Sequence, residues 1–319
     1  MSSTRTTKPP SPPGTGRPVR RPGDRVFAGT AKGAGVLILV ILAGVAAFLL
    51  VEALPALTAP AEEIPGGGGL ASYIAPLVFG TLLAAVIALL VATPLAVGIA
   101  LFIAYYAPRR LAQGLGYVVD LLAAIPSIVY GFWGIFWLAP RLAPFYEWLE
   151  RNLGFIPLFA GPASTTGRTM LTVGLVLAVM ILPIVSAISR EVFLQVPGLH
   201  REAALALGAT RWEMIRMAVL PYGRSGVIGG AMLGLGRALG ETMAVAIVLS
   251  VSGGITFNLI SSGNPSTIAA NIALEFPESS GIDINTLIAS GLALFVITLA
   301  VNVLARAIVN RRADFSGAN

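Results

Sequence analysis

Residues 196–226 read VPGLHREAALALGATRWEMIRMAVLPYGRSG, and this polar stretch between two apolar runs decides the fold. A helix-forming run begins at Glu202, and Gly208 interrupts it because glycine enters the left-handed region freely. Pro221 should end the run that follows, since proline disfavours helical geometry in the residue before it. The stretch therefore predicts two short helices joined at a bend.

These two helices carry apolar side chains that need a partner surface, namely Leu205, Leu207, Trp212, Ile215 and Met217. One interpretation is a docking surface for another protein. The other is an amphipathic helix lying on lipid at the membrane surface. Composition alone does not decide between the two.

The chain as a whole is too apolar for a water-soluble domain. Hydrophobic residues make up 56% of the 319 residues and charged residues 11%, whereas soluble domains carry roughly 25% charge. The chain has no cysteine and a single histidine, His200. Disulfides and thiolate metal sites are therefore excluded, a histidine metal site has no basis, and we expect no metal or cofactor.

The fold class is an all-α integral membrane protein with about six transmembrane helices, because each apolar run is long enough to cross about 30 Å of hydrocarbon. Pro94, Pro126 and Pro183 fall inside runs and indicate kinks. Ser127, after the Pro126 kink, can donate to an anion, although a helix break explains it equally well. The expected spans are Ala34–Leu54, Ile74–Tyr106, about Leu115–Leu138, Met170–Ser189, Gly226–Val251 and about Thr286–Val309.

The first run could also be a signal peptide, but it is too long for a typical apolar signal core. We therefore expect the following order along the chain: a disordered basic cytoplasmic tail at 1–32, the first transmembrane helix with an outer loop at 33–73, a membrane-embedded core at 74–309 with a cytoplasmic loop at 193–222, and a second cytoplasmic tail at 310–319.

The basic residues set the expected orientation. Of the 21 Lys and Arg residues, 17 lie in the tails and loops on one side of the expected spans and three lie on the other. The remaining one, Arg237, lies inside a span. Because cytoplasmic loops collect Lys and Arg, we expect both termini in the cytoplasm and an outer loop at residues 139–168. This placement explains the net charge of +6 without nucleic acid.

Arg237 and Glu241 lie near the middle of the expected span Gly226–Val251. A charge there costs about 2.5–3.5 kcal/mol, so each needs a purpose and a partner. Four-residue spacing predicts an ion pair on one helix face. Gly226, Gly230 and Gly234 share that face, where they allow another helix to approach closely. The face predicts an anion path, and a purely structural pair is the alternative.

The stretch 196–226 resembles the EAA loop of ABC importer permeases, which forms a coupling helix that docks on a cytoplasmic ATPase subunit. The usual isoleucine two places before Leu-Pro is Ala218 here, which removes one apolar contact of the pattern. The residues that carry the resemblance are Glu202, Ala203, Ala204, Gly208, Leu220 and Pro221.

Residues 220–245, LPYGRSGVIGGAMLGLGRALGETMAV, and 123–131, AAIPSIVYG, resemble the phosphate-specific permeases, more the C-type subunit than its A-type paralogue. This resemblance covers about Leu70 to Ile308. It implies the type I ABC importer permease fold, phosphate as substrate, and a role for Arg237 and Glu241 in translocation. It also implies a bacterial cytoplasmic membrane location and several partners: an A-type permease, two ATPase subunits and an extracytoplasmic phosphate-binding protein.

The chain lacks the G-x-x-x-x-G-K-[ST] loop that binds nucleotide phosphates, since its only lysines are Lys8 and Lys32. ATP hydrolysis must therefore belong to a separate chain, and we do not expect an enzyme. A permease for another oxyanion and the A-type paralogue remain alternatives within the class. A secondary transporter or channel is the alternative from another class, but it leaves the EAA-like loop unexplained and predicts inverted repeats, which the sequence does not display.

Overall fold

The computed structural model describes residues 22–313, and nearly all of its regular structure is helical. Within that range the only β pairing is an isolated bridge between Val251 and Asn264. The chain divides into two compact units, residues 1–48 and 49–319.

The first unit contains most of helix α1 (Pro22–Thr58). Its apolar side chains from Val36 to Phe48 are largely exposed, as expected for a helix that contacts lipid. The expected tail at 1–32 is wrong from residue 22 onward, because Pro22 begins the helix and proline suits a first helical position. Residues 1–21 lie outside the described residues.

The core of the second unit forms where α2 (Leu70–Leu101) packs along α6 (Met170–Leu194). Small side chains on α2 permit this close approach, and a Cβ on Gly174 of α6 would clash with Ile87. The fully buried alanines of α2 are Ala88, Ala92, Ala96 and Ala100.

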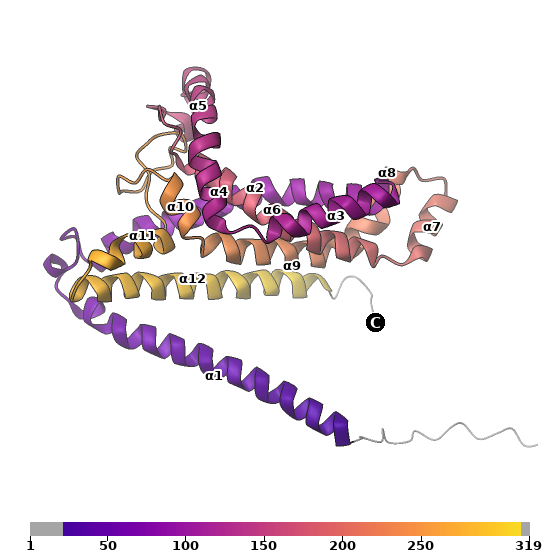
Figure 1. Ribbon diagram of the computed structural model, residues 1–319, viewed down its shortest axis with the longest axis horizontal. Helices are drawn as coiled ribbons and strands as arrows, with labels where there is room; N and C mark the ends of the chain where they lie inside the picture. Colours follow the sequence, from indigo (N-terminus) through magenta and orange to yellow (C-terminus); the bar gives the residue numbers. More distant parts are fainter. Residues whose placement is uncertain (1–21, 314–319) are drawn as a thin grey trace, which may run out of the picture. The chain divides into compact units, whose positions relative to one another are not determined.

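Helices α9 (Leu220–Leu239) and α12 (Ile282–Ala313) complete the bundle beside α2 and α6. Figure 1 shows α2, α6, α9 and α12 running along one another, with α7 (Gly198–Ala206) and α8 (Arg211–Met214) at one end. At the other end lie α10 (Met243–Val248) and α11 (Ile268–Glu275).

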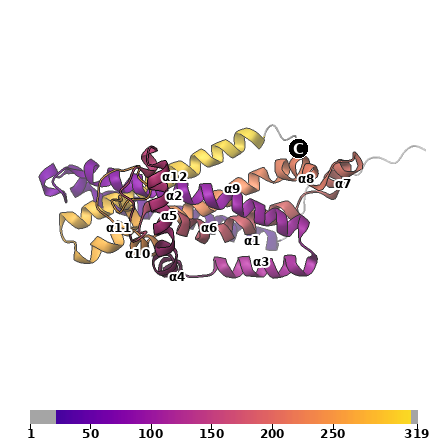
Figure 2. The same ribbon diagram turned by 90° about the horizontal axis from the view of Figure 1, so that it is seen from above.

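The expected span Leu115–Leu138 is broken. Helix α3 (Arg109–Ala123) runs along the bundle, and a 94° bend separates it from a rod formed by α4 (Ser127–Trp133), a π-helical turn and α5 (Ala139–Leu153) (Figure 2). The sequence predicted a kink at Pro126 but not its size. The expected outer loop at 139–168 therefore begins with a helix.

Four described helices are long and apolar enough to cross a membrane, or five if the bent pair at Pro126 counts as one span. They include α1, α2, α6 and α12. The remaining expected span, Gly226–Val251, is divided between α9 and α10.

Candidate functional site

The break between α9 and α10 separates the two charges that the sequence placed on one helix face. Arg237 lies in the last turn of α9, and Glu241 lies in the break after Gly240. Glu241 is only 7% exposed, and its Oε1 accepts the backbone N–H of Ala244 at 3.1 Å. Among residues 22–313 no ion pair joins Arg237 to Glu241, so the predicted ion pair is wrong.

Local chemistry explains this difference. Gly236 and Gly240 weaken the helix, because glycine costs about 1 kcal/mol relative to alanine in a helix interior. Once α9 ends, the free N–H groups at the start of α10 attract a carboxylate. The Glu241 carboxylate therefore accepts a hydrogen bond from the backbone of α10 and does not pair with the Arg237 side chain.

The glycine face of α9 packs inside this chain. A Cβ on Gly226 would clash with Val192, one on Gly230 would come within 3.3 Å of Ile188, and one on Gly234 within 3.0 Å of the Val185 Cγ2 atom. All three neighbours belong to α6. The prediction of a close helix approach is confirmed, and the helix that approaches is α6.

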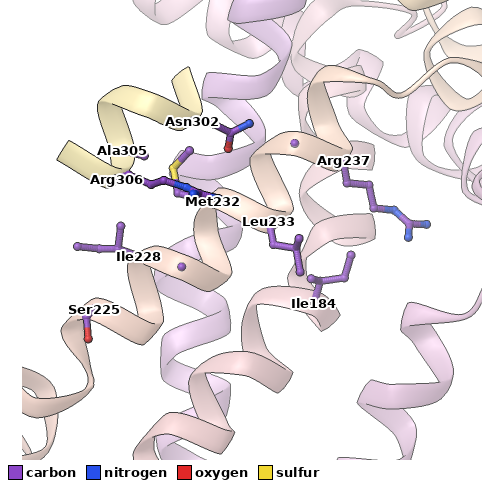
Figure 3. A pocket seen from close by; sticks show the side chains of 11 residues that line it. Ile184, Ser225, Ile228, Met232, Leu233, Arg237, Asn302, Ala305 and Arg306 are labelled. Carbon is purple, nitrogen blue, oxygen red and sulfur yellow. The ribbon is translucent and has the colours of Figure 1, made fainter. Parts of the chain in front are cut away.

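A cavity of about 800 Å³ opens on another side of α9, between α9, α12 and Ile184 of α6. Figure 3 shows Arg306 reaching from α12 toward Met232, whereas the Arg237 side chain points away from α12. The residues that line the cavity are Ile184, Ser225, Ile228, Gly229, Met232, Leu233, Gly236, Arg237, Asn302, Ala305 and Arg306.

Among the residues that the structure describes, the lining contains two arginines and no acidic side chain. Its volume falls within the usual range of ligand sites, roughly 300–1,000 Å³. Glycine at positions 229 and 236 leaves open space beside α9, since a Cβ there would meet nothing within 4 Å. The cavity can therefore accept a small anion. Arg306 was not singled out from the sequence, because only the fold brings α12 against α9.

Ser127 is not among the residues that line this cavity. It is the first residue of α4, directly after the 94° bend. The nearby Tyr130 hydroxyl donates to the Leu122 carbonyl oxygen at 2.8 Å and thus ties α4 to α3 across the bend. The structure therefore does not bring Ser127 together with Arg237 in one pocket.

At the opposite end of α9 the loop forms two short helices joined at Gly208, as predicted. Gly208 has a φ of +84°, a conformation that side chains disfavour. Thr210 then caps α8: its Oγ1 accepts the Glu213 N–H at 3.3 Å, and its own N–H donates to Glu213 Oε2 at 2.8 Å. The Thr210 backbone N–H and the Thr210 hydroxyl, which both donate to the Glu213 carboxylate, hold the pKa of that carboxyl below its usual value.

Pro221 does not end the second helix, and that expectation is wrong. Helix α8 continues through a π-helical turn, Ile215–Val219, into α9. The wider turn immediately before Pro221 changes the hydrogen-bond pattern where the proline lacks an N–H, so the chain stays helical.

The loop divides its apolar residues between the bundle and the surface. Ala204 packs against a cluster with Leu101, Phe193 and Met214, and the Arg201 guanidinium lies 5.8 Å from the ring centroid of Tyr105 in the π-helical turn that follows α2. Glu202 and Ala203 are exposed. The exposed apolar residues are Leu199, Leu205, Leu207 (89% exposed), Trp212 and Met217. Ile215 is buried, contrary to its expected place on this surface.

A chain of several apolar helices, with an arginine-lined cavity and a loop that exposes apolar side chains, is typical of membrane permease components. Residues 96–314 match the family described as binding-protein-dependent transport system inner membrane component. The chain belongs to this family, whose members work with separate ATPase and binding-protein partners.

Related proteins match this chain over nearly its whole length. The chain is 48% identical to phosphate transport system permease protein PstC 2 of Mycobacterium tuberculosis, over 93% of this chain and 95% of the relative. It is 45% identical to PstC of Mycobacterium leprae, over 96% and 99%. A crystal structure of a bacterial ABC transporter involved in alginate import has a chain with a TM-score of 0.50 and 17% identity, over 89% of this chain and 98% of that chain. The fold is that of type I ABC importer permeases.

Proposed function

We propose that this chain is the permease subunit of an ATP-driven importer that carries inorganic phosphate across the bacterial cytoplasmic membrane. The cavity lined by Arg237 and Arg306, without an acidic side chain, is the observation that carries the proposal. A guanidinium matches phosphate oxygens with two parallel N–H donors and keeps its charge at any physiological pH. The names of the relatives support phosphate as the anion.

Arg237 is the side chain that we assign to the anion path. It lies at the edge of the cavity and at the end of α9, and within residues 22–313 no carboxylate pairs with it. Glu241 contributes to the path indirectly: it lies in the break after α9 and its carboxylate fixes the start of α10. Ser127, at the Pro126 bend, has a lesser role in the path.

The loop at 193–222 couples this subunit to ATP hydrolysis. Its exposed apolar side chains, chiefly Leu207 and Trp212, are better suited to contact a groove on a partner protein than to contact water. The proposed coupling residues are Glu202, Ala203, Ala204, Gly208, Leu220 and Pro221. The full transporter would contain an A-type permease subunit, two ATPase subunits and an extracytoplasmic phosphate-binding protein.

In this arrangement the α7–α8 end of the bundle faces the cytoplasm and the α10–α11 end faces outward, with both termini inside. The core at 74–309 lies in the bilayer, and the tail at 310–319 follows it. A permease for another oxyanion is the second candidate, because arginine binds other oxyanions by the same geometry. An A-type subunit, a secondary transporter and a channel fit less well, given C-type relatives and the exposed docking loop.

The test is uptake of radiolabelled phosphate by the complete transporter in proteoliposomes, with sulfate as competitor. Arg237→Gln should lower uptake at least about tenfold while the complex still assembles, because a charged hydrogen bond to the anion is lost. Arg151→Gln is the matched control, since Arg151 forms only an exposed ion pair with Glu147 at 3.0 Å.

The double variant Arg237→Gln/Glu241→Gln separates transport from structure. A structural ion pair predicts that neutralising both charges restores uptake. We expect no recovery, because the double variant still lacks the cation. Full recovery would contradict the transport role of Arg237, and sulfate that competes as well as phosphate would favour a general oxyanion permease.

A further inference from the structure

The end of α10 farthest from Glu241 is held by a side chain from a distant part of the sequence. Arg168 donates from Nε to the Val248 carbonyl oxygen at 3.3 Å, and from Nη2 to the carbonyl oxygens of Ile247 at 3.3 Å and Leu249 at 3.2 Å. A helix leaves its last carbonyls without partners inside the helix. One guanidinium therefore satisfies three consecutive carbonyls at the end of α10.

Asn264 holds the next carbonyl. Its Nδ2 donates to the carbonyl oxygens of Ser250 at 3.1 Å and Ser261 at 3.0 Å, and its Oδ1 accepts the Met170 N–H at 3.1 Å. The side chain is fully buried. Asn264 thereby fastens Ser250, two residues beyond the end of α10, to the first residue of α6.

A close packing contact brings Arg168 into place. Gly167, with a φ of +70°, lies against the Ala139 carbonyl, where a Cβ would clash. The Arg168 carbonyl in turn accepts from Asn264 Nδ2 at 3.5 Å. Arg168 and Asn264 thus belong to one network, which we call the Arg168–Asn264 network.

Helix α10 depends on this network because it is only six residues long, far below the length at which a helix is stable alone. Its two ends carry the charges that its dipole favours: the Glu241 carboxylate at the amino end and the Arg168 guanidinium at the carboxyl end. Whatever moves one end of so short a helix also moves the other.

We propose that Arg168 and Asn264 are positioning residues for the translocation site: they fix α10, and through α10 they fix Glu241 and the break that follows Arg237. The link to transport rests on the proposed function. The positioning of α10 does not, because it can be measured without any substrate.

The experiment uses the whole transporter and a single reporter cysteine. The chain has no cysteine, and Met243 at the start of α10 is 43% exposed. In a Met243→Cys background, maleimide labelling is followed in Arg168→Gln, Arg168→Lys and the control Arg151→Gln. Arg168→Gln should raise the labelling rate about fivefold or more, since hydrogen bonds from a charged group are lost.

Arg168→Lys should fall between the parent and Arg168→Gln, because an ammonium can donate to the same carbonyls but lacks the planar fork. Arg151→Gln should match the parent. In uptake assays Arg168→Gln should lower the maximal rate about fivefold while leaving half-saturation nearly unchanged, because Arg168 does not line the cavity. Arg168→Lys should recover part of that rate.

Parent-like labelling in Arg168→Gln would overturn the positioning role, whatever its uptake. Raised labelling with normal uptake would overturn the link between α10 and transport. If Arg168→Gln does not accumulate, Arg168→Lys decides by the same measurement, and parent-like labelling in it overturns the proposal. Raised labelling together with no phosphate uptake by the parent would leave the positioning role standing and refute phosphate as the substrate.

Discussion

At the scale of single residues, Arg237 and Glu241 have separate partners although only four positions separate them. The cost of buried charge predicted that both residues matter. Gly236 and Gly240 weaken the helix locally, but the geometry of the two charges could not be predicted, because the position of α10 also depends on Arg168, whose bond to Val248 spans 80 positions. A helical wheel assumes an unbroken helix, and no local signal in residues 226–251 points to Arg168.

Glu241 variants should distinguish a capping role from a charge role. Glu241→Gln keeps an oxygen that can accept the Ala244 N–H, so uptake should stay within about twofold of the parent. Glu241→Ala removes the acceptor, and loss of such a cap costs about 0.5–2 kcal/mol. We therefore expect Glu241→Ala to lower phosphate uptake about fivefold in proteoliposomes.

Equal loss in the glutamine and alanine variants would contradict this prediction. It would mean that the negative charge itself acts on the transported anion, and that the bond to Ala244 is incidental. Maleimide labelling of Met243→Cys provides the control, because only loss of the cap should loosen the start of α10.

At the scale of elements, α9 has two glycine faces with different neighbours. Gly226, Gly230 and Gly234 pack on α6, while Gly229 and Gly236 line the cavity. The four-residue repeat predicted a close helix contact. Which helix makes that contact depends on Val185, Ile188 and Val192, whose position on α6 no feature of α9 encodes.

Leucine substitutions on the two faces should have opposite consequences. Gly226→Leu forces a side chain into Val192 and should destabilise the subunit by about 1–3 kcal/mol. Gly236→Leu meets open space, so it should leave thermal stability near that of the parent but reduce uptake by filling the cavity. Thermal unfolding of the purified subunit in detergent, with uptake alongside, measures both effects.

The reverse pattern would refute this assignment of the two faces. A Gly236→Leu subunit that unfolds earlier would place that face inside the fold, and one with normal uptake would remove the cavity from the path. Gly114→Leu is a neutral comparison, because a Cβ at that helical glycine also meets nothing within 4 Å.

At the scale of the whole molecule, composition and the loop at 196–226 were enough to predict a helical membrane permease. The order of the long apolar helices is also as expected. The folded segments between them were not predicted, since α5 and α11 are too short to span a membrane and the Arg168–Asn264 network contains no apolar run. Some of their hydrogen bonds also join distant positions, such as that of Asn264 with the Met170 N–H and that of Asn271 with the Tyr73 hydroxyl.

The charge distribution predicts orientation, which cysteine labelling in intact cells can test. Phe155 is 80% exposed beyond α5, and Gln195 is exposed beyond the opposite end of α6. A membrane-impermeant maleimide added outside should label Phe155→Cys and should label neither Gln195→Cys nor Ser3→Cys. The basic residues near the last two sites favour the cytoplasm.

Labelling of Gln195→Cys or Ser3→Cys from outside would show that the topology is the reverse of the predicted one. Cell permeabilisation is the control, since both sites should then react, and a site that stays silent would be buried in the assembled transporter.

The π-helical turn Ile215–Val219 also has a consequence for how this chain tolerates insertions and deletions. Such a turn stores one residue more than an α-helical turn between the same two helices. Deleting one residue there would let the turn relax to ordinary α-helix, and the surface of α8 would keep its orientation about the axis of α9 because the turn holds one residue in excess. Deleting one residue from the α-helical part of α9 would instead rotate that surface by about 100°. The docking loop would then keep every side chain and present the wrong ones. The π-helical turn is thus the place where this helix absorbs a one-residue change, and we expect natural relatives to differ in length there and not within α9.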